Sequence, residues 1–177
     1  MRNLGIIFSI LTFATLSFTF TQIEKEEIGS SPGVIQAIGD AGSPQVFTFQ
    51  KWEFIKAEIP DNKIENIQVE IEINTSSLTC DWKDLEKSIR KKKDYFYAKK
   101  FPKAMVSING AEAIEDGKYK TQAMLTLKKY TEPVELIFTV EGNQVKGEGM
   151  ITRQDFGFTG GGPKNEVPIS FDVTLPL

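Results

Sequence analysis

The stretch "IENIQVEIEIN" at residues 64–74 alternates between apolar and polar side chains. Ile67, Val69, Ile71 and Ile73 fall on one side of the chain, and the polar residues between them fall on the other. Successive side chains of a β-strand point to opposite faces of a sheet. The pattern therefore predicts a strand with one buried face and one solvated face.

Similar alternation recurs along the chain after residue 22. Turn-forming pairs such as Asp116-Gly117 and Gly142-Asn143 separate the runs. Eight or nine antiparallel strands with one apolar face each predict a closed β-barrel, and a β-sandwich is the less favoured alternative. The clear runs cover residues 119–128, 133–140 and 166–175, and shorter ones cover 33–38, 45–49, 52–59, 104–109 and 144–151.

The alternation changes phase near Gln50. Phe47 and Phe49 precede this point, and Trp52 and Phe54 follow it at positions of the opposite parity. A bulge or sharp bend would let all four rings face one interior. We therefore predict a bend in the chain here.

One segment, "TCDWKDLEKSIRKKKDYF" at residues 79–96, follows a helical period instead. Trp82, Leu85 and Ile89 have the spacing i, i+3, i+7, which places them on one face of an α-helix. We predict a single short helix at about residues 81–92, with these three side chains packed against one end of the barrel.

The composition excludes several classes of active site. The chain has no histidine and one cysteine, so Ser-His-Asp and Cys-His catalysis, His-ligated zinc and an intrachain disulfide are all ruled out. We expect no enzymatic activity, no cofactor and no metal site. An enzyme would have to use Asp, Lys or Tyr chemistry at the barrel mouth. The lone Cys80 is predicted to be a small buried hydrophobe.

The first residues resemble a targeting segment. Arg2 is followed by a run without charge from Asn3 to Ile23. This predicts a signal peptide at residues 1–22, a barrel domain at residues 23–177, and a periplasmic or secreted protein. A retained membrane anchor is the less favoured alternative.

The segment after the predicted helix is strongly basic, although the chain has a formal net charge of −3. A solvated face, a rim that meets anionic lipid headgroups and a nucleic-acid site are three interpretations. The acidic balance and the predicted export argue against nucleic acid. We expect Phe96 and Phe101 to close the barrel mouth, with lysines around them. The lysines assigned to this rim are Lys91, Lys92, Lys93, Lys99 and Lys100.

Three motifs resemble those of the YceI-like family of exported lipid-binding proteins. They are "INTSSLTCDW…KDYFYAKKFPKAMVSI", "LTLKKYTEPVELIF" and "GEGMITRQDFGF", which occur in the family's order within about residues 45–175. The resemblance implies an eight-stranded, lipocalin-like antiparallel barrel around a long apolar tunnel. It also implies a bound polyisoprenoid chain, such as a quinone or prenyl phosphate tail, in the bacterial periplasm.

We expect the barrel interior to bind an apolar lipid, with a polyisoprenoid or isoprenoid quinone as the partner. The alternative is a ligand-free barrel that binds a protein or a membrane surface through its basic helix face. The candidate ligand-binding residues are Phe47, Phe49, Trp52, Phe54, Ile67, Val69, Ile71, Ile73, Val106, Ile108, Leu125, Phe138 and Phe171.

Overall fold

The computed structural model describes residues 31–162 and 164–177. The predicted signal peptide at residues 1–22 and the start of the predicted domain at residue 23 lie outside the described residues. Within them, no helix combines the length and the apolar character needed to cross a membrane.

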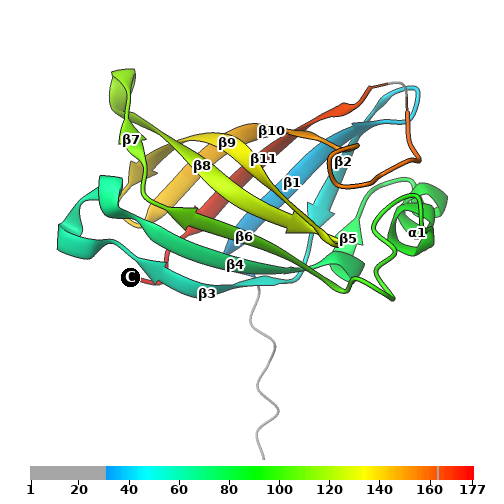
Figure 1. The fold of residues 1–177 in the computed structure, drawn as a ribbon, viewed down its shortest axis with the longest axis horizontal. Coiled ribbons are helices and arrows are strands. Elements are labelled where there is room, and N and C mark those ends of the chain that lie inside the picture. The colour runs from blue at the N-terminus through cyan, green and yellow to red at the C-terminus, as the bar shows by residue number, and fades with distance from the viewer. Residues whose placement is uncertain (1–30, 163) are drawn as a thin grey trace, which may run out of the picture.

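A single antiparallel sheet of eleven strands makes up the described part of the chain. The sheet curls around an interior, and one helix lies beyond one of its ends (Figure 1). The strand order is β3-β4-β6-β8-β9-β10-β11-β1-β2-β5, and β7 pairs with β8. The strands are β1 (Gly33–Asp40), β2 (Pro44–Phe49), β3 (Trp52–Glu58), β4 (Gln68–Asn74), β5 (Leu78–Thr79), β6 (Lys103–Asn109), β7 (Glu112–Ala113), β8 (Lys118–Leu127), β9 (Tyr130–Glu141), β10 (Gln144–Thr152) and β11 (Glu166–Thr174).

A sharp bend between β2 and β3 brings the two ends of the sheet together. These strands are consecutive in sequence, yet β2 pairs with β1 and β3 pairs with β4. At the corner, the backbone N–H of Gln50 donates to Ser77 O (3.3 Å), and that of Lys51 donates to Ser77 Oγ (3.0 Å). Phe47, Phe49 and Trp52 are all buried on the inner side. The predicted bend is confirmed.

The bend also reconciles the strand count with the predicted barrel. The strands β5 and β7 have two residues each. If β2 and β3 are taken as one bent strand, and these two short strands are set aside, eight principal strands remain. The lipocalin-like antiparallel fold predicted from the sequence is confirmed.

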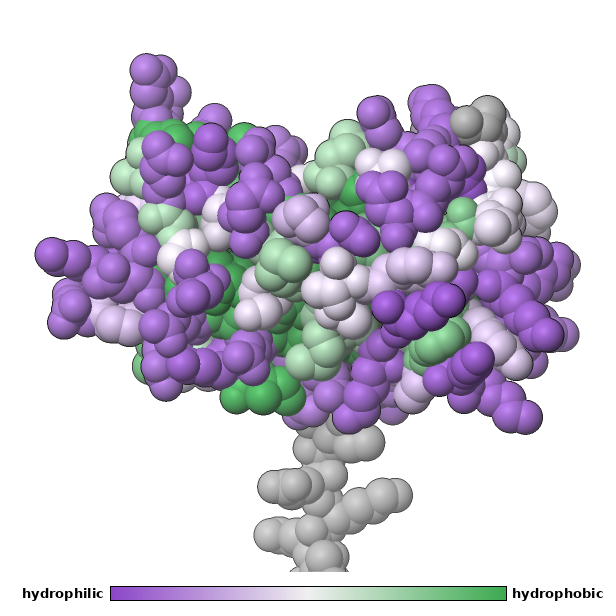
Figure 2. Space-filling model, in the orientation of Figure 1, coloured by the Kyte–Doolittle hydropathy of each residue, from purple (hydrophilic) through white to green (hydrophobic). Residues whose placement is uncertain are grey.

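The interior consists of the apolar positions of the alternating runs. In β4, Val69, Ile71 and Ile73 are 3%, 8% and 5% exposed. Pairing places Phe54, Ile71, Val106 and Leu125 in one row across β3, β4, β6 and β8. Each fully buried side chain of this size contributes about 1.5–3 kcal/mol to folding. The face of the molecule shown in Figure 2 is mostly hydrophilic, with hydrophobic residues in patches between polar ones.

The helix α1 (Lys83–Lys91) begins two residues later than predicted. Leu85 and Ile89 pack against the core as expected. Trp82 does not, because it precedes the helix with an extended backbone (φ −89°, ψ 97°), and its side chain is 51% exposed. The prediction for Trp82 is therefore wrong. Glu86, on the next turn, is the buried residue of the helix.

Candidate functional site

An apolar cavity of about 140 Å³, here called the inner cavity, lies inside the curled sheet. Side chains from β1, β2, β3, β4, β6 and the strands from β8 to β11 line it, together with Phe96. Gln36 and Ser170 are the only polar residues among those that line it. A cavity of about 150 Å³ lined by Leu, Ile and Phe stays dry and can bind benzene. The inner cavity is thus suited to a slim apolar group.

Eleven of the thirteen candidate residues line the inner cavity. Phe47 lines a second cavity nearer α1 instead. Trp52 lines neither and packs edge-on against Phe54, with ring centroids 5.3 Å apart. That these residues contact a ligand stays a prediction. The eleven are Phe49, Phe54, Ile67, Val69, Ile71, Ile73, Val106, Ile108, Leu125, Phe138 and Phe171.

Other residues that line the inner cavity were absent from the predicted set. Some of them belong to clear alternating runs, so the signal was present in the sequence. In β1 the signal was weaker, because Val34 and Ile38 are exposed apolar residues on the opposite face from Ile35. The missed apolar residues are Ile35, Ala37, Phe96, Ala104, Ala123, Leu127, Val134, Leu136, Val145, Ile151, Ile169, Val173 and Leu175.

The second cavity, here called the outer chamber, has a volume of about 490 Å³. Leu85 and Ile89 of α1 line it, as does the glycine loop at residues 160–162. It is adjacent to the inner cavity, because five residues line both: Ala37, Phe49, Phe96, Leu127 and Ile151.

Phe96 lies at the boundary between the two cavities. Its ring packs edge-on against Phe49 (centroids 5.8 Å apart) and Phe158 (5.0 Å). This agrees with its predicted place at the barrel mouth. Phe101 lines neither cavity and packs against Tyr97, with centroids 6.4 Å apart. The predicted role of Phe101 at the mouth is therefore wrong.

A buried carboxylate fixes α1 at this end of the barrel. Glu86 Oε2 accepts hydrogen bonds from Lys83 Nζ (2.9 Å) and the Cys80 backbone N–H (3.2 Å), and Oε1 pairs with Arg90 Nη2 (2.8 Å). The hydrogen bond from Lys83, followed by that from Cys80, lowers the pKa of Glu86. Cys80 is free and 7% exposed, as predicted.

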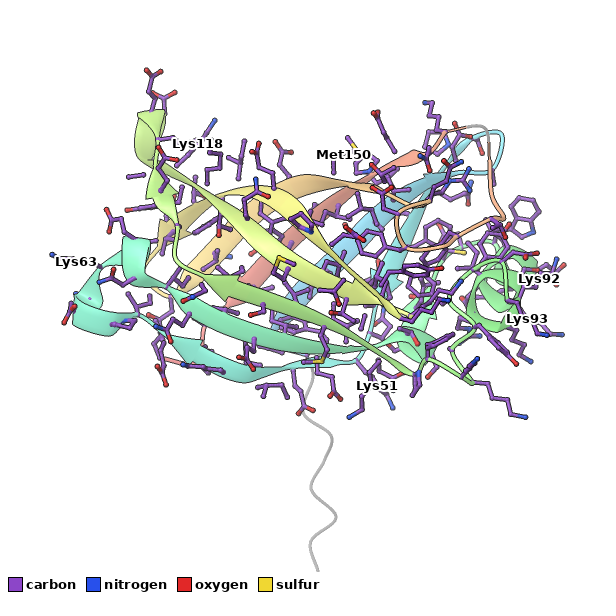
Figure 3. The ribbon with its side chains drawn as sticks, viewed as in Figure 1. Lys51, Lys63, Lys92, Lys93, Lys118 and Met150 are labelled. Atoms are coloured by element: carbon purple, nitrogen blue, oxygen red, sulfur yellow. The ribbon has the colours of Figure 1, made fainter. Side chains whose placement is uncertain are left out.

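The lysines of the predicted rim are exposed beside α1. Lys92 and Lys93 lie at this end of the barrel, whereas Lys63 and Lys118 lie at the opposite end (Figure 3). Lys128 anchors the segment after α1, because its Nζ donates to Lys93 O (3.1 Å) and Gly157 O (2.9 Å). Burial lowers the pKa of Lys128. Exposed basic side chains, Lys92 and Lys93 among them, thus lie at the end of the barrel near α1.

The described residues contain no group of three or more His, Cys, Asp or Glu side chains that could hold a metal ion. What the two cavities offer a ligand is an apolar surface with a polar, partly charged outer end. Such sites bind through shape and the exclusion of water, and a few polar groups fix the ligand's orientation.

Together, the curled sheet and its interior define a small β-barrel protein with an internal apolar cavity. The description "YceI-like domain" matches residues 43–175, so the protein belongs to the YceI-like family. No curated protein matches the sequence.

Several solved structures share the fold. BcnA of Burkholderia cenocepacia is 22% identical with a TM-score of 0.68, and the match covers 80% of this chain and 94% of BcnA. A polyisoprenoid binding domain from Saccharophagus degradans is 11% identical with a TM-score of 0.58, covering 83% and 96% of the two chains. The YCEI protein of Campylobacter jejuni is 13% identical with a TM-score of 0.60, covering 94% and 96%.

Proposed function

We propose that this protein is an exported binding protein that holds an apolar lipid, of the polyisoprenoid class, inside its barrel for transport or storage. The observation that carries the proposal is the inner cavity, whose lining is apolar except for Gln36 and Ser170. Membership of the YceI-like family supports it, and so does the shared fold with a polyisoprenoid binding domain.

The dimensions of the cavities favour a long, slim ligand. The inner cavity has a volume of about 140 Å³, is lined by residues of nine strands, and suits a slim apolar group. The outer chamber, at about 490 Å³, lies within the roughly 300–1,000 Å³ typical of small-molecule sites. In the proposed complex a flexible hydrocarbon chain occupies both adjacent cavities, whereas a bulky rigid molecule would fit the outer chamber alone.

Binding of this kind needs no catalytic residue. An apolar chain is held because its burial removes hydrocarbon surface from water, at about 0.8 kcal/mol per CH₂ group. The proposed role is therefore lipid binding and transport without catalysis. Export, as the sequence of residues 1–22 predicts, is part of the proposal.

We further propose that the basic rim directs the protein to an anionic membrane surface, which is a source of such lipids. The side chains of this rim are exposed, and Lys92 and Lys93 lie at the end of the barrel near α1 (Figure 3). The rim consists of Lys91, Lys92, Lys93, Lys99 and Lys100. Each lysine near an anionic leaflet contributes about 1 kcal/mol of attraction.

The experiment that tests the proposal is extraction of the exported, purified protein with organic solvent, followed by mass spectrometry. A prenyl lipid present in about stoichiometric amount is expected. If no lipid is extracted, and the delipidated protein does not bind geranylgeraniol, the proposal is wrong. The basic helix face would then be the remaining candidate, as the surface of a ligand-free interaction module.

A further inference from the structure

The outer chamber contains a positive charge that no carboxylate of the described residues neutralises. Three charged side chains line it: Asp40, Arg153 and Lys164. Lys164 Nζ lies 3.6 Å from Asp40 Oδ2, so these two form an ion pair. Among the described residues, no carboxylate lies within 4.0 Å of a nitrogen of Arg153. The chamber therefore has one unpaired cation.

The guanidinium of Arg153 is held by backbone carbonyls alone. Nη1 donates to Gly160 O and Nη2 donates to Gly162 O. Nε is buried and has no hydrogen-bond partner among the described residues. Leaving a buried donor of a charged group unsatisfied costs about 1–3 kcal/mol or more.

The three consecutive glycines explain how the loop approaches Arg153 so closely. Gly161 has a φ of +122°, which disfavours other residues, and a Cβ atom on Gly161 would overlap Nη1 of Arg153. The sequence alone indicated only a turn at these residues. In the structure, the loop covers a partly buried cation at the edge of an apolar chamber.

A purely structural arginine, which only fixes this loop, would be expected to have its donors satisfied and its charge paired. Arg153 lacks both features. Its planar guanidinium presents N–H pairs that match the two oxygens of a carboxylate or phosphate. Such an anion is a stronger acceptor for a guanidinium than a peptide carbonyl, so it can take the place of a glycine carbonyl.

We infer that Arg153 binds the anionic headgroup, a phosphate or carboxylate, of the apolar chain held in the barrel. The inference rests on the proposed function and adds the ligand's charge and orientation to it. The headgroup lies in the outer chamber near α1, and the tail passes Phe96 into the inner cavity. The shared chemistry is an oxyanion, whether it belongs to a lipid headgroup or to free phosphate.

The test compares ligands that differ only in the headgroup. Geranylgeranyl monophosphate and geranylgeraniol are titrated into the delipidated full-length mature protein, and inorganic phosphate is titrated alone. We expect the monophosphate to bind about 10- to 100-fold more tightly than the alcohol, which is the usual range for a hydrogen bond to a charged group. Millimolar inorganic phosphate should neither bind measurably nor displace the alcohol.

Variants then assign the preference to a residue. In Arg153→Gln, the ratio of the two dissociation constants should fall to near one, while affinity for the alcohol stays within about twofold. Arg153→Lys should retain part of the preference, since the charge remains but the paired donors do not. Lys63→Gln, at the opposite end of the barrel, has the same change in charge and should leave the ratio unchanged.

Each result has a definite meaning. If the wild-type protein binds both lipids equally, or if Arg153→Gln keeps the preference, the inference is wrong and the proposed function stands. If inorganic phosphate binds as tightly as the monophosphate, the site is for a free anion and the headgroup assignment is wrong. If neither lipid binds, the proposed function itself fails. Should Arg153→Gln not fold, the wild-type ratio and the Arg153→Lys variant still decide.

Discussion

Substitution of Ile71 by tryptophan tests whether the inner cavity is the lipid site. Ile71 is 8% exposed, lines the cavity, and pairs with Phe54 on one side and Val106 on the other. All three lie in the same row of the inner face. A larger side chain at this position would extend into the inner cavity and occupy the space proposed for the lipid.

The structure sets the expected magnitudes. Placing a larger side chain in a fully packed core costs about 1–3 kcal/mol, and changes that suit the available volume cost less than about 1.5. Since the cavity of about 140 Å³ is close to one that takes benzene, we expect Ile71→Trp to fold with less than about 1.5 kcal/mol of destabilisation. Each isoprene unit displaced by the indole removes about five buried carbons. At about 0.8 kcal/mol per CH₂, this is roughly 4 kcal/mol, or about a thousandfold in Kd.

The measurements are urea unfolding for stability, and lipid content together with geranylgeraniol titration for binding. Ile55→Trp is the matched control, because Ile55 is 54% exposed on the outer side of β3 and should change neither property. A folded Ile71→Trp protein with wild-type lipid content would refute the assignment of the ligand to this cavity. Destabilisation by more than about 3 kcal/mol would show that the interior is already filled.

Three further predictions concern the end of the barrel near α1 and its contacts. The Glu86 carboxylate interacts with three donor groups and has a lowered pKa. Its stabilising effect is therefore present at neutral pH and is lost as the pH falls and the carboxylate is protonated. The difference in unfolding free energy between wild type and Glu86→Gln should accordingly shrink from pH 7 to pH 3. Trp82→Ala should change the unfolding free energy by less than about 0.5 kcal/mol because the side chain is exposed. Trp52→Ala should lower the unfolding free energy by about 3–5 kcal/mol because that side chain is buried. Equal effects of the two substitutions in urea unfolding would contradict this prediction. Replacing Lys91, Lys92 and Lys93 with Gln should weaken binding to vesicles with anionic lipids by up to about 3 kcal/mol at low salt, and should not alter the melting temperature. If the wild-type protein does not bind such vesicles at about 20 mM salt, the lysines form only a solvated basic face. The control for loss of positive charge is a double Gln variant at Lys63 and Lys118, which lie at the opposite end of the barrel.

The sequence was sufficient to predict the strands and their inner faces, because a period of two residues is a local property. In β4 and β11 the alternation identifies the inward side chains directly. It does not show how much space they leave between them. A packed barrel and one with a 140 Å³ cavity differ by about the volume of one benzene molecule, which depends on rotamers and on contacts between distant strands. This is why Trp52 and Phe54 have the same parity in the sequence, yet Phe54 lines the cavity and Trp52 does not.

The errors near α1 have a different cause. The spacing of Trp82, Leu85 and Ile89 fits a helix, but a helical period places a residue on the buried face only if the helix includes it. The helix begins at Lys83, four residues after the end of β5, and β5 is fixed by its pairing with β2. From this position Glu86 can accept a hydrogen bond from the N–H of Cys80. Arg153 was missed for a related reason. Its partners are backbone carbonyls of a glycine loop seven and nine residues away, and carbonyl positions have no signature in the amino-acid sequence. Arg153 borders the outer chamber and has no carboxylate partner among the described residues. This becomes visible only when the fold is known, and it is the observation from which the anionic headgroup is inferred.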